Sequence, residues 1–103
     1  MFTVIRKQVR PNKDIPFYIE KYPPTEEYNM YFYEKYMKTG KFIKSEKHLM
    51  DDGVTMISTI VWKSHLIFIE YVTDEVCYNN MIAPNNAYDD SNNIETAFSI
   101  IEE

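Results

Sequence analysis

Residues 54–62, VTMISTIVW, constrain the fold of this chain more than any other segment. The segment is rich in β-branched residues, which is typical of a strand. Alternate residues of a strand lie on opposite faces, and neither face of this one carries a charge. One face holds Thr55, Ile57, Thr59 and Val61, and the other holds Val54, Met56, Ser58, Ile60 and Trp62. A strand without a wet face is covered on both sides, so we expect it in the centre of a sheet.

The segment 59–74, TIVWKSHLIFIEYVTD, determines how the chain leaves this strand. The Ile, Phe, Tyr and Val residues of 65–72 favour a second strand after a hairpin at Lys63-Ser64. The favoured two-residue hairpin turns need Gly, Asn or Asp to supply a positive φ, and this turn has none. Ser64 is instead a good helix N-cap, which favours a helix. In that helix one face would carry Phe68, Ile69 and Val72. The residues alone leave both interpretations open.

The first half of the chain predicts a strand, a connection, a helix and another strand. Residues 2–10 read as a strand that ends at Pro11, and residues 11–24 hold four of the five prolines, with a helical turn expected after Pro16. Thr25 can cap a helix that runs to Gly40. Its apolar stripe consists of Tyr28, Phe32 and Tyr36, with Tyr31 beside it. Residues 41–50 read as a strand, and Asp51-Asp52-Gly53 predicts a hairpin into residues 54–62.

The second half predicts one more helical region and a last strand. Thr73 or Asp74 can cap a helix over residues 74–83, and Pro84 then kinks this helix or opens another. Residues 94–101, IETAFSII, read as the last strand. With the helix interpretation of residues 64–72, the order is β-α-β-β-α-β. Residues 1–103 are enough for one domain with one core, so we expect a single α+β domain.

The charge of the chain argues against nucleic acid as its main partner. The net charge is -5, whereas phosphate binding needs a basic surface. The charge is uneven, because residues 1–47 sum to +4 and residues 48–103 sum to -9. No apolar stretch approaches the ~20 residues of a membrane span, and no signal-peptide pattern is present. The single Cys77 excludes an internal disulfide and is expected to be a buried apolar residue in a reducing, cytoplasmic setting.

Motifs for metal, phosphate or cofactor chemistry are absent from the sequence. Gly40 and Gly53 are the only glycines, so there is no Gly-rich phosphate loop. The two histidines and one cysteine lack metal-ligand spacing. The adjacent acids at 51–52 and 89–90 are expected to be solvated turn residues. We therefore expect neither a metal nor a cofactor.

The sequence VWKS at residues 61–64, followed by Phe68, Tyr71 and Asp74, resembles the strand-to-helix junction of the antibiotic-biosynthesis-monooxygenase-like superfamily. The similarity is clearest between Gly53 and Ile94. The TGK helix end at 39–41 and the Asn-rich tail are also similar to small proteins of this type from phages and marine microbes. The resemblance favours the helix after Ser64. It implies a ferredoxin-like fold, with a four-stranded antiparallel sheet and helices on one face, and a dimeric α+β barrel formed through the sheet face.

The resemblance implies no haem chemistry. Haem-degrading relatives use an Asn, a Trp and a His at positions that correspond here to Arg6 or Lys7, to Tyr71 and to a residue near Met81. None of the three matches. Cofactor-free relatives oxidise polycyclic phenols in a pocket of Asn, Trp, Tyr and Arg residues. Such residue types are supplied here by Trp62, Tyr71, Tyr88 and Asn92, and a pocket could also reach His48 on the second strand.

Three functions remain open from the sequence, and whether the chain is an enzyme is not decided. The first is a small homodimeric protein with a structural, interaction or accessory role, which a filled, dry core would favour. The second is a binder of a small aromatic or apolar ligand in the cleft between helices and sheet, beside Trp62 and Tyr71. The third is a cofactor-independent monooxygenase. For the homodimer we expect an uncharged face of residues 54–62, joined by Phe98 and Ile100, to meet a second copy.

Overall fold

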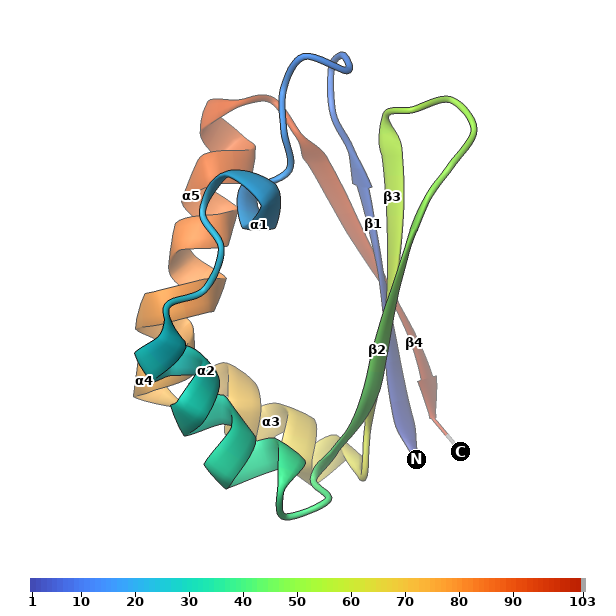
Figure 1. Cartoon of the computed structure of the whole chain (residues 1–103). Coiled ribbons are helices and arrows are strands. Elements are labelled where there is room, and N and C mark those ends of the chain that lie inside the picture. The colour runs from blue at the N-terminus through green and yellow to red at the C-terminus, as the bar shows by residue number, and fades with distance from the viewer. Residues whose placement is uncertain (103) are drawn as a thin grey trace.

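The computed structural model describes residues 1–102, which form one antiparallel sheet with helices on one of its faces (Figure 1). The strands are β1 (Phe2–Val9), β2 (Phe42–Leu49), β3 (Thr55–Trp62) and β4 (Glu95–Glu102). They are ordered β2-β3-β1-β4, and every neighbouring pair is antiparallel. This is the predicted ferredoxin-like β-α-β-β-α-β arrangement. β3 has a neighbour on each side, as its two uncharged faces predicted.

Two helical segments cover the sheet. The first connects β1 to β2 and contains α1 (Tyr18–Lys21), α2 (Glu26–Phe32) and the π-helical turn η1 (Tyr33–Met37). The second connects β3 to β4 and contains α3 (His65–Thr73), α4 (Glu75–Cys77), the π-helical turn η2 (Tyr78–Ile82) and α5 (Ala83–Ser91). In Figure 1, α1 lies next to α5 at one end of the layer, and α2 lies next to α3 and α4 at the other.

The chain leaves β3 through a helix and not through a hairpin. β3 ends at Trp62, and Ser64 caps α3 by accepting a hydrogen bond at its Oγ from the backbone N–H of Ile67, at 3.3 Å. The backbone of Ser64 is extended, with φ -157°, so no residue of this junction needs a positive φ. The helix interpretation of residues 64–72 is confirmed, and the hairpin interpretation is wrong.

Other local predictions are also confirmed. Thr25 caps α2 by accepting a hydrogen bond at its Oγ1 from the backbone N–H of Tyr28, at 3.1 Å. Gly40 and Gly53 have positive φ angles of 74° and 73°. At Gly53 the positive φ is what favours glycine, because the atoms nearest to an added Cβ belong to the flexible end of the Lys13 side chain, which can move aside. Pro84 opens α5 in its first turn, directly after the π-helical turn η2.

The strand register decides which residues face the helices. Directly paired residues of antiparallel strands lie on the same face. Phe2 pairs with Trp62, and Arg6 pairs with both Ser58 and Phe98. Because Trp62 packs against the helices, all of these residues lie on the helix side. The expected outer face needs correction here: Ile57 and Val61 do lie on it, but Phe98 and Ile100 lie on the opposite side of the sheet.

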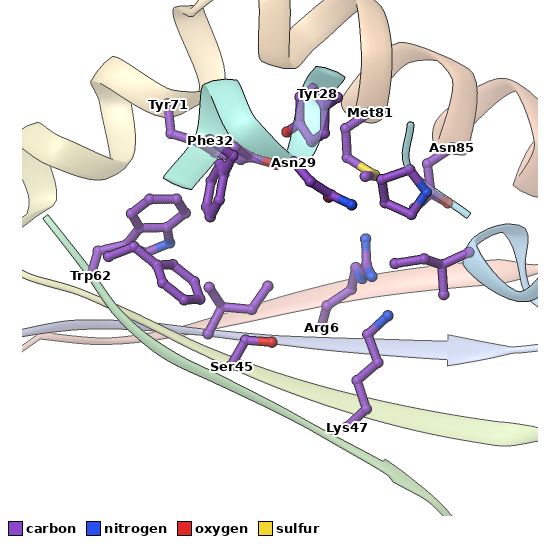
Figure 2. Close-up of a pocket in the computed structure, with 14 residues that line it drawn as sticks. Arg6, Tyr28, Asn29, Phe32, Ser45, Lys47, Trp62, Tyr71, Met81 and Asn85 are labelled. Carbon is purple, nitrogen blue, oxygen red and sulfur yellow. The ribbon is translucent and has the colours of Figure 1, made fainter. Parts of the chain in front are cut away.

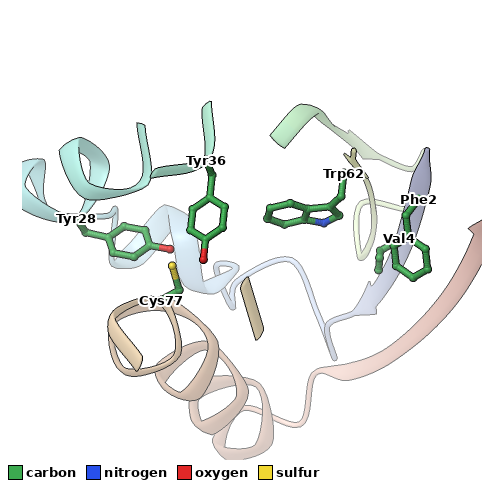
Figure 3. Close-up of a cluster of buried hydrophobic side chains, with 6 residues drawn as sticks. All are labelled: Phe2, Val4, Tyr28, Tyr36, Trp62 and Cys77. Carbon is green, nitrogen blue, oxygen red and sulfur yellow. The ribbon is translucent and has the colours of Figure 1, made fainter. Parts of the chain in front are cut away.

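The core lies at the end of the sheet where β3 enters α3. Trp62 is 2% exposed and Tyr36 is fully buried, and their ring centroids are 6.0 Å apart. Figure 3 shows both rings between the sheet and the Cys77 thiol. Cys77 is buried, as predicted, and burial raises the pKa of its thiol to about 11. The aromatic stripe of residues 28–36 is therefore core.

The Asp74 carboxylate ties the two helical segments together. It accepts hydrogen bonds from Nζ of Lys35 at 2.7 Å and from the hydroxyls of Tyr36 and Tyr31 at 2.7 and 2.9 Å, all from the first segment. Within its own segment it caps α4 through the backbone N–H groups of residues 76 and 77. Burial raises the pKa of Asp74, but the hydrogen bonds outweigh burial and hold this pKa well below its ordinary value.

We expect Trp62→Ala to lower the free energy of unfolding by about 3–5 kcal/mol, because it leaves a large cavity in the core. Urea denaturation followed by far-ultraviolet circular dichroism measures the loss without needing the tryptophan. Leu66→Ala is the control, since Leu66 is 79% exposed. This control should stay within about 0.5 kcal/mol of the parent protein. A loss under about 1 kcal/mol for Trp62→Ala would contradict the core role.

We expect Asp74→Asn to lower the free energy of unfolding by about 1.5–3 kcal/mol near neutral pH, because the hydrogen bonds to a charged carboxylate weaken. The side chain of Lys35 is 38% exposed, so its ammonium group can turn to water and the loss stays below that of a fully buried ion pair. The lowered pKa of Asp74 means that its carboxylate stabilises the fold above its unfolded pKa of about 3.9. This stabilisation is lost as the pH falls toward the folded pKa. The difference between the two proteins should therefore narrow in urea denaturation at about pH 3.

Glu75→Gln is the matched control for this prediction, because Glu75 is the adjacent carboxylate and is exposed. It should change stability by less than about 0.5 kcal/mol at either pH. An equal loss for Asp74→Asn at both pH values would show that the carboxylate acts through its shape and not through its charge.

Candidate functional site

A cleft of about 240 Å³ lies between the helical layer and the sheet (Figure 2). From the sheet side, Arg6, Lys47 and Trp62 point into it. From the helical side it is lined by residues of α2, α3, η2 and α5. These are Tyr28, Asn29, Phe32, Tyr71, Met81 and Asn85.

Two further hollows continue this cleft. One, of about 190 Å³, extends it toward Phe68 and Phe98. The other, of about 120 Å³, extends it toward Phe17 and Glu20 of the α1 region. Arg6 and Asn85 line all three. Pockets for small molecules typically have about 300–1,000 Å³, so the hollows must act together to hold one.

The change in side-chain type from one row of the sheet to the next explains why the cleft stays open. At the end near α3, the row Phe42–Trp62–Phe2 crosses the sheet and fills the space with aromatic rings. One row further, Ser45 stands beside Ile60, and beyond it Lys47 and Arg6 flank Ser58. Small and charged side chains cannot fill an apolar interior, so the helices do not pack closely against these rows.

The cleft combines flat apolar walls at its aromatic end with buried polar atoms that lack partners. The ring centroids of Trp62 and Tyr71 are 4.7 Å apart. Burial raises the pKa of the Tyr71 hydroxyl to about 12, so this group stays protonated at neutral pH. Nε1 of Trp62 and Oδ1 of Asn85 are buried without a hydrogen-bond partner among residues 1–102. Buried polar atoms are nearly always paired, so each of these atoms requires an explanation.

Of the residues predicted for a pocket, the structure brings only Trp62 and Tyr71 to the cleft. The Tyr88 hydroxyl donates a hydrogen bond to the carbonyl of Pro16 and thereby holds α1 against α5. Asn92 ends α5, where its Nδ2 donates to the carbonyl of Tyr88 at 2.9 Å. His48 pairs with Ile57 and so lies exposed on the outer face of the sheet.

Arg6, Lys47 and Asn85 line the cleft but were not predicted as site residues. A signal for Arg6 was present, because it falls in the same alternation as the buried Phe2, Val4 and Gln8 of β1. A charged residue on the buried face of a strand is a candidate for a functional role. Lys47 carried no such signal, since its neighbours along β2 are polar on both faces.

The residues of the cleft do not fit haem. Haem iron in most such sites needs a histidine ligand, and neither histidine lines the cleft. His48 lies on the outer face, and the ring of His65 stacks on Phe2 at 4.6 Å between centroids. Within the described chain, no group of three His, Cys, Asp or Glu residues could hold a metal ion. None of the helices described is long and apolar enough to cross a membrane.

Comparison with known proteins supports the fold. No family model and no curated protein matches the chain. Among solved structures, the chain is similar to a dimeric ferredoxin-like protein from an uncultured marine organism, with a TM-score of 0.64 and 14% identity. The match covers 97% of this chain and 92% of that chain. At this identity the similarity shows the fold alone, and it confirms the predicted ferredoxin-like class.

Proposed function

We propose that this protein binds a small aromatic or apolar molecule in the cleft between its helices and its sheet. The observation that carries the proposal is the open cleft beside a core tryptophan whose Nε1 has no partner. A purely structural or accessory protein is expected to fill this space with its own side chains. The open cleft therefore favours a ligand-binding function over a purely structural or accessory role.

The walls of the cleft suit a flat ligand. Phe32, Phe42, Trp62 and Tyr71 surround its aromatic end, and Ile60 and Met81 line its middle. Aromatic rings add about 0.5–1.5 kcal/mol per well-placed ring contact beyond simple burial. A ligand that accepts a hydrogen bond from Nε1 of Trp62 would also satisfy a buried donor.

Trp62 makes the proposal directly testable, since it is the only tryptophan of the chain. We expect N-phenyl-1-naphthylamine, an uncharged aromatic probe, to cause a saturable change in Trp62 fluorescence. Ser45→Phe should abolish this change, because Ser45 lines the cleft and the larger ring would fill it. Ser91→Phe is the control, since Ser91 is exposed at the end of α5 and should bind the probe normally. Equal binding by both variants would place the probe outside the cleft.

We further propose that the chain is a member of the antibiotic-biosynthesis-monooxygenase-like superfamily. Its element order and its VWKS junction at residues 61–64 support this assignment. Tyr71 and Met81, which correspond to functional positions of the haem-degrading relatives, both line the cleft. Their side chains differ from those of the relatives, so the assignment extends to the location of the site and not to its reaction.

We also propose that the protein is a homodimer that pairs through the outer face of the sheet. The middle of this face holds Ile5, Ile57 and Thr59, which are partly exposed, with Lys7 beside Ile57, and no helix covers it (Figure 1). An apolar sheet face of this kind is rarely left to water, and a two-fold axis covers it with its own copy. The structurally similar marine protein is described as dimeric, which supports a dimer here.

Sedimentation at low micromolar concentration should give about twice the chain mass of 12.3 kDa, and high salt should not dissociate the dimer. Ile57→Glu should give monomers, because dimerisation would bury the new negative charge at the interface. The monomer itself should stay folded, because Lys7 lies beside residue 57 and offsets this charge. Ile100→Glu makes the same change on the helix side of β4, where Ile100 is 58% exposed, and should leave the dimer intact. Dissociation by Ile100→Glu alone would place the interface on the other side of the sheet.

A further inference from the structure

A row of polar side chains crosses the helix side of the sheet in the middle of the cleft. Lys47 of β2 pairs with Ser58 of β3, and Ser58 pairs with Arg6 of β1. The three residues therefore stand side by side on adjacent strands and point toward the helices. Figure 2 shows the nitrogens of Arg6 and Lys47 directed into the same space, below Asn29 and Asn85.

This row has no counter-charge in contact with it. Neither Arg6 nor Lys47 makes a hydrogen bond or an ion pair within residues 1–102, although Asp89 and Glu20 act on them from a distance. Asp89 is buried, and its Oδ2 accepts hydrogen bonds from Gln8 at 2.9 Å and Thr96 at 3.1 Å. Its Oδ1 has no hydrogen-bond partner among residues 1–102, so this carboxylate acts on Arg6 through its charge but does not contact it. Glu20 is exposed at the α1 end of the cleft.

The environment of the two cations is unfavourable as it stands. Nε of Arg6 and Oγ of Ser58 are buried without partners, and Ser58 is 1% exposed. Burial lowers the pKa of Lys47, and the nearby Arg6 lowers it further. Partly buried charges of one sign need a partner of the opposite sign to offset their desolvation.

From this geometry we infer that the ligand of the cleft is a small aromatic acid, whose anionic group lies between Arg6 and Lys47. The inference rests on the proposed function and names the class of its ligand. The anion would sit above the polar row, and the aromatic part would extend two rows along the sheet to Trp62 and Phe32. Arginine is suited to the anionic end, because its guanidinium can donate two parallel hydrogen bonds to a carboxylate or sulfonate.

Two probes that share one aromatic skeleton distinguish the contribution of the anionic group to binding from the contribution of the rings. 1-Anilinonaphthalene-8-sulfonate carries an anionic group that N-phenyl-1-naphthylamine lacks. We expect fluorescence titration to show at least about tenfold tighter binding of the sulfonate, since one charged hydrogen bond accounts for about a factor of ten. Arg6→Gln and Lys47→Gln should each weaken the sulfonate by about tenfold and the neutral probe by less than about twofold. Arg6→Lys keeps the charge but loses the paired donors, so it should weaken the sulfonate less than Arg6→Gln does.

Matched controls lie on the same strands. Lys7→Gln on β1 and Lys44→Gln on β2 remove the same charge from the outer face of the sheet, and neither should change the affinity of either probe. Near-ultraviolet circular dichroism checks that each variant is folded. Lys47 lies on the edge strand β2 and keeps part of its side chain in water, so Lys47→Gln tests the inference even where Arg6→Gln folds poorly.

The outcomes are distinguishable. The inference of an anionic ligand would be wrong if the two probes bound with equal affinity and neither Arg6→Gln nor Lys47→Gln changed the affinity of either probe. The proposed binding function would still hold in that case. Loss of sulfonate binding in Lys7→Gln instead would place the anion on the outer face and also overturn the inference. The absence of binding by both probes would remove the proposed function itself.

Discussion

Asp74 is the contact on which the helical layer depends. Its carboxylate accepts hydrogen bonds from three side chains of η1 and α2, and it caps α4 within its own segment. Because the donors come from both helical segments, Asp74 joins the two segments directly, without the sheet between them. A buried carboxylate with this many donors is satisfied in one geometry only, so the relative placement of α2 and α3 follows from it.

A helical layer joined in this way can rest on the sheet at one end and stand away from it further along. The contact is made by Trp62, Tyr36 and Phe2, which are almost completely buried. In the next row Ser45 stands beside Ile60, and in the row after that Lys47 and Arg6 flank Ser58, and a space remains open above these residues. The cleft is therefore a consequence of two features, a rigid layer and a sheet whose helix side changes character along its length.

The two faces of this sheet present different chemistry, because side chains alternate along each strand. On β3, Ser58 and Ile60 point to the cleft, whereas Ile57 and Thr59 point outward. The proposed ligand and the proposed second copy would thus occupy opposite faces of the same strands. In this arrangement, contacts between subunits would leave the lining of the cleft exposed to its ligand.

The sequence by itself determined the elements and their order. The caps at Thr25 and Ser64, the turn glycines and the central strand with two uncharged faces depend on residues that are near one another along the chain, and such signals can be read locally. The aromatic stripe of Tyr28, Phe32 and Tyr36 was predicted from helical spacing for the same reason, and the structure shows that it packs in the core. The resemblance at residues 61–64 favoured the helix interpretation of the junction, which the structure then confirmed.

Only the tertiary structure decided which side chains share the cleft. The pairing of β4 with β1 places Phe98 and Ile100 on the helix side, and the pairing of β2 with β3 places His48 outside and Lys47 inside. Tyr88 and Asn92 have side chains of the right type for a pocket, but α5 directs them to α1 and to its own end. A shift of one residue in strand register moves every side chain of a strand to the other face. Register arises from contacts between residues far apart in the chain, so local sequence patterns do not contain it.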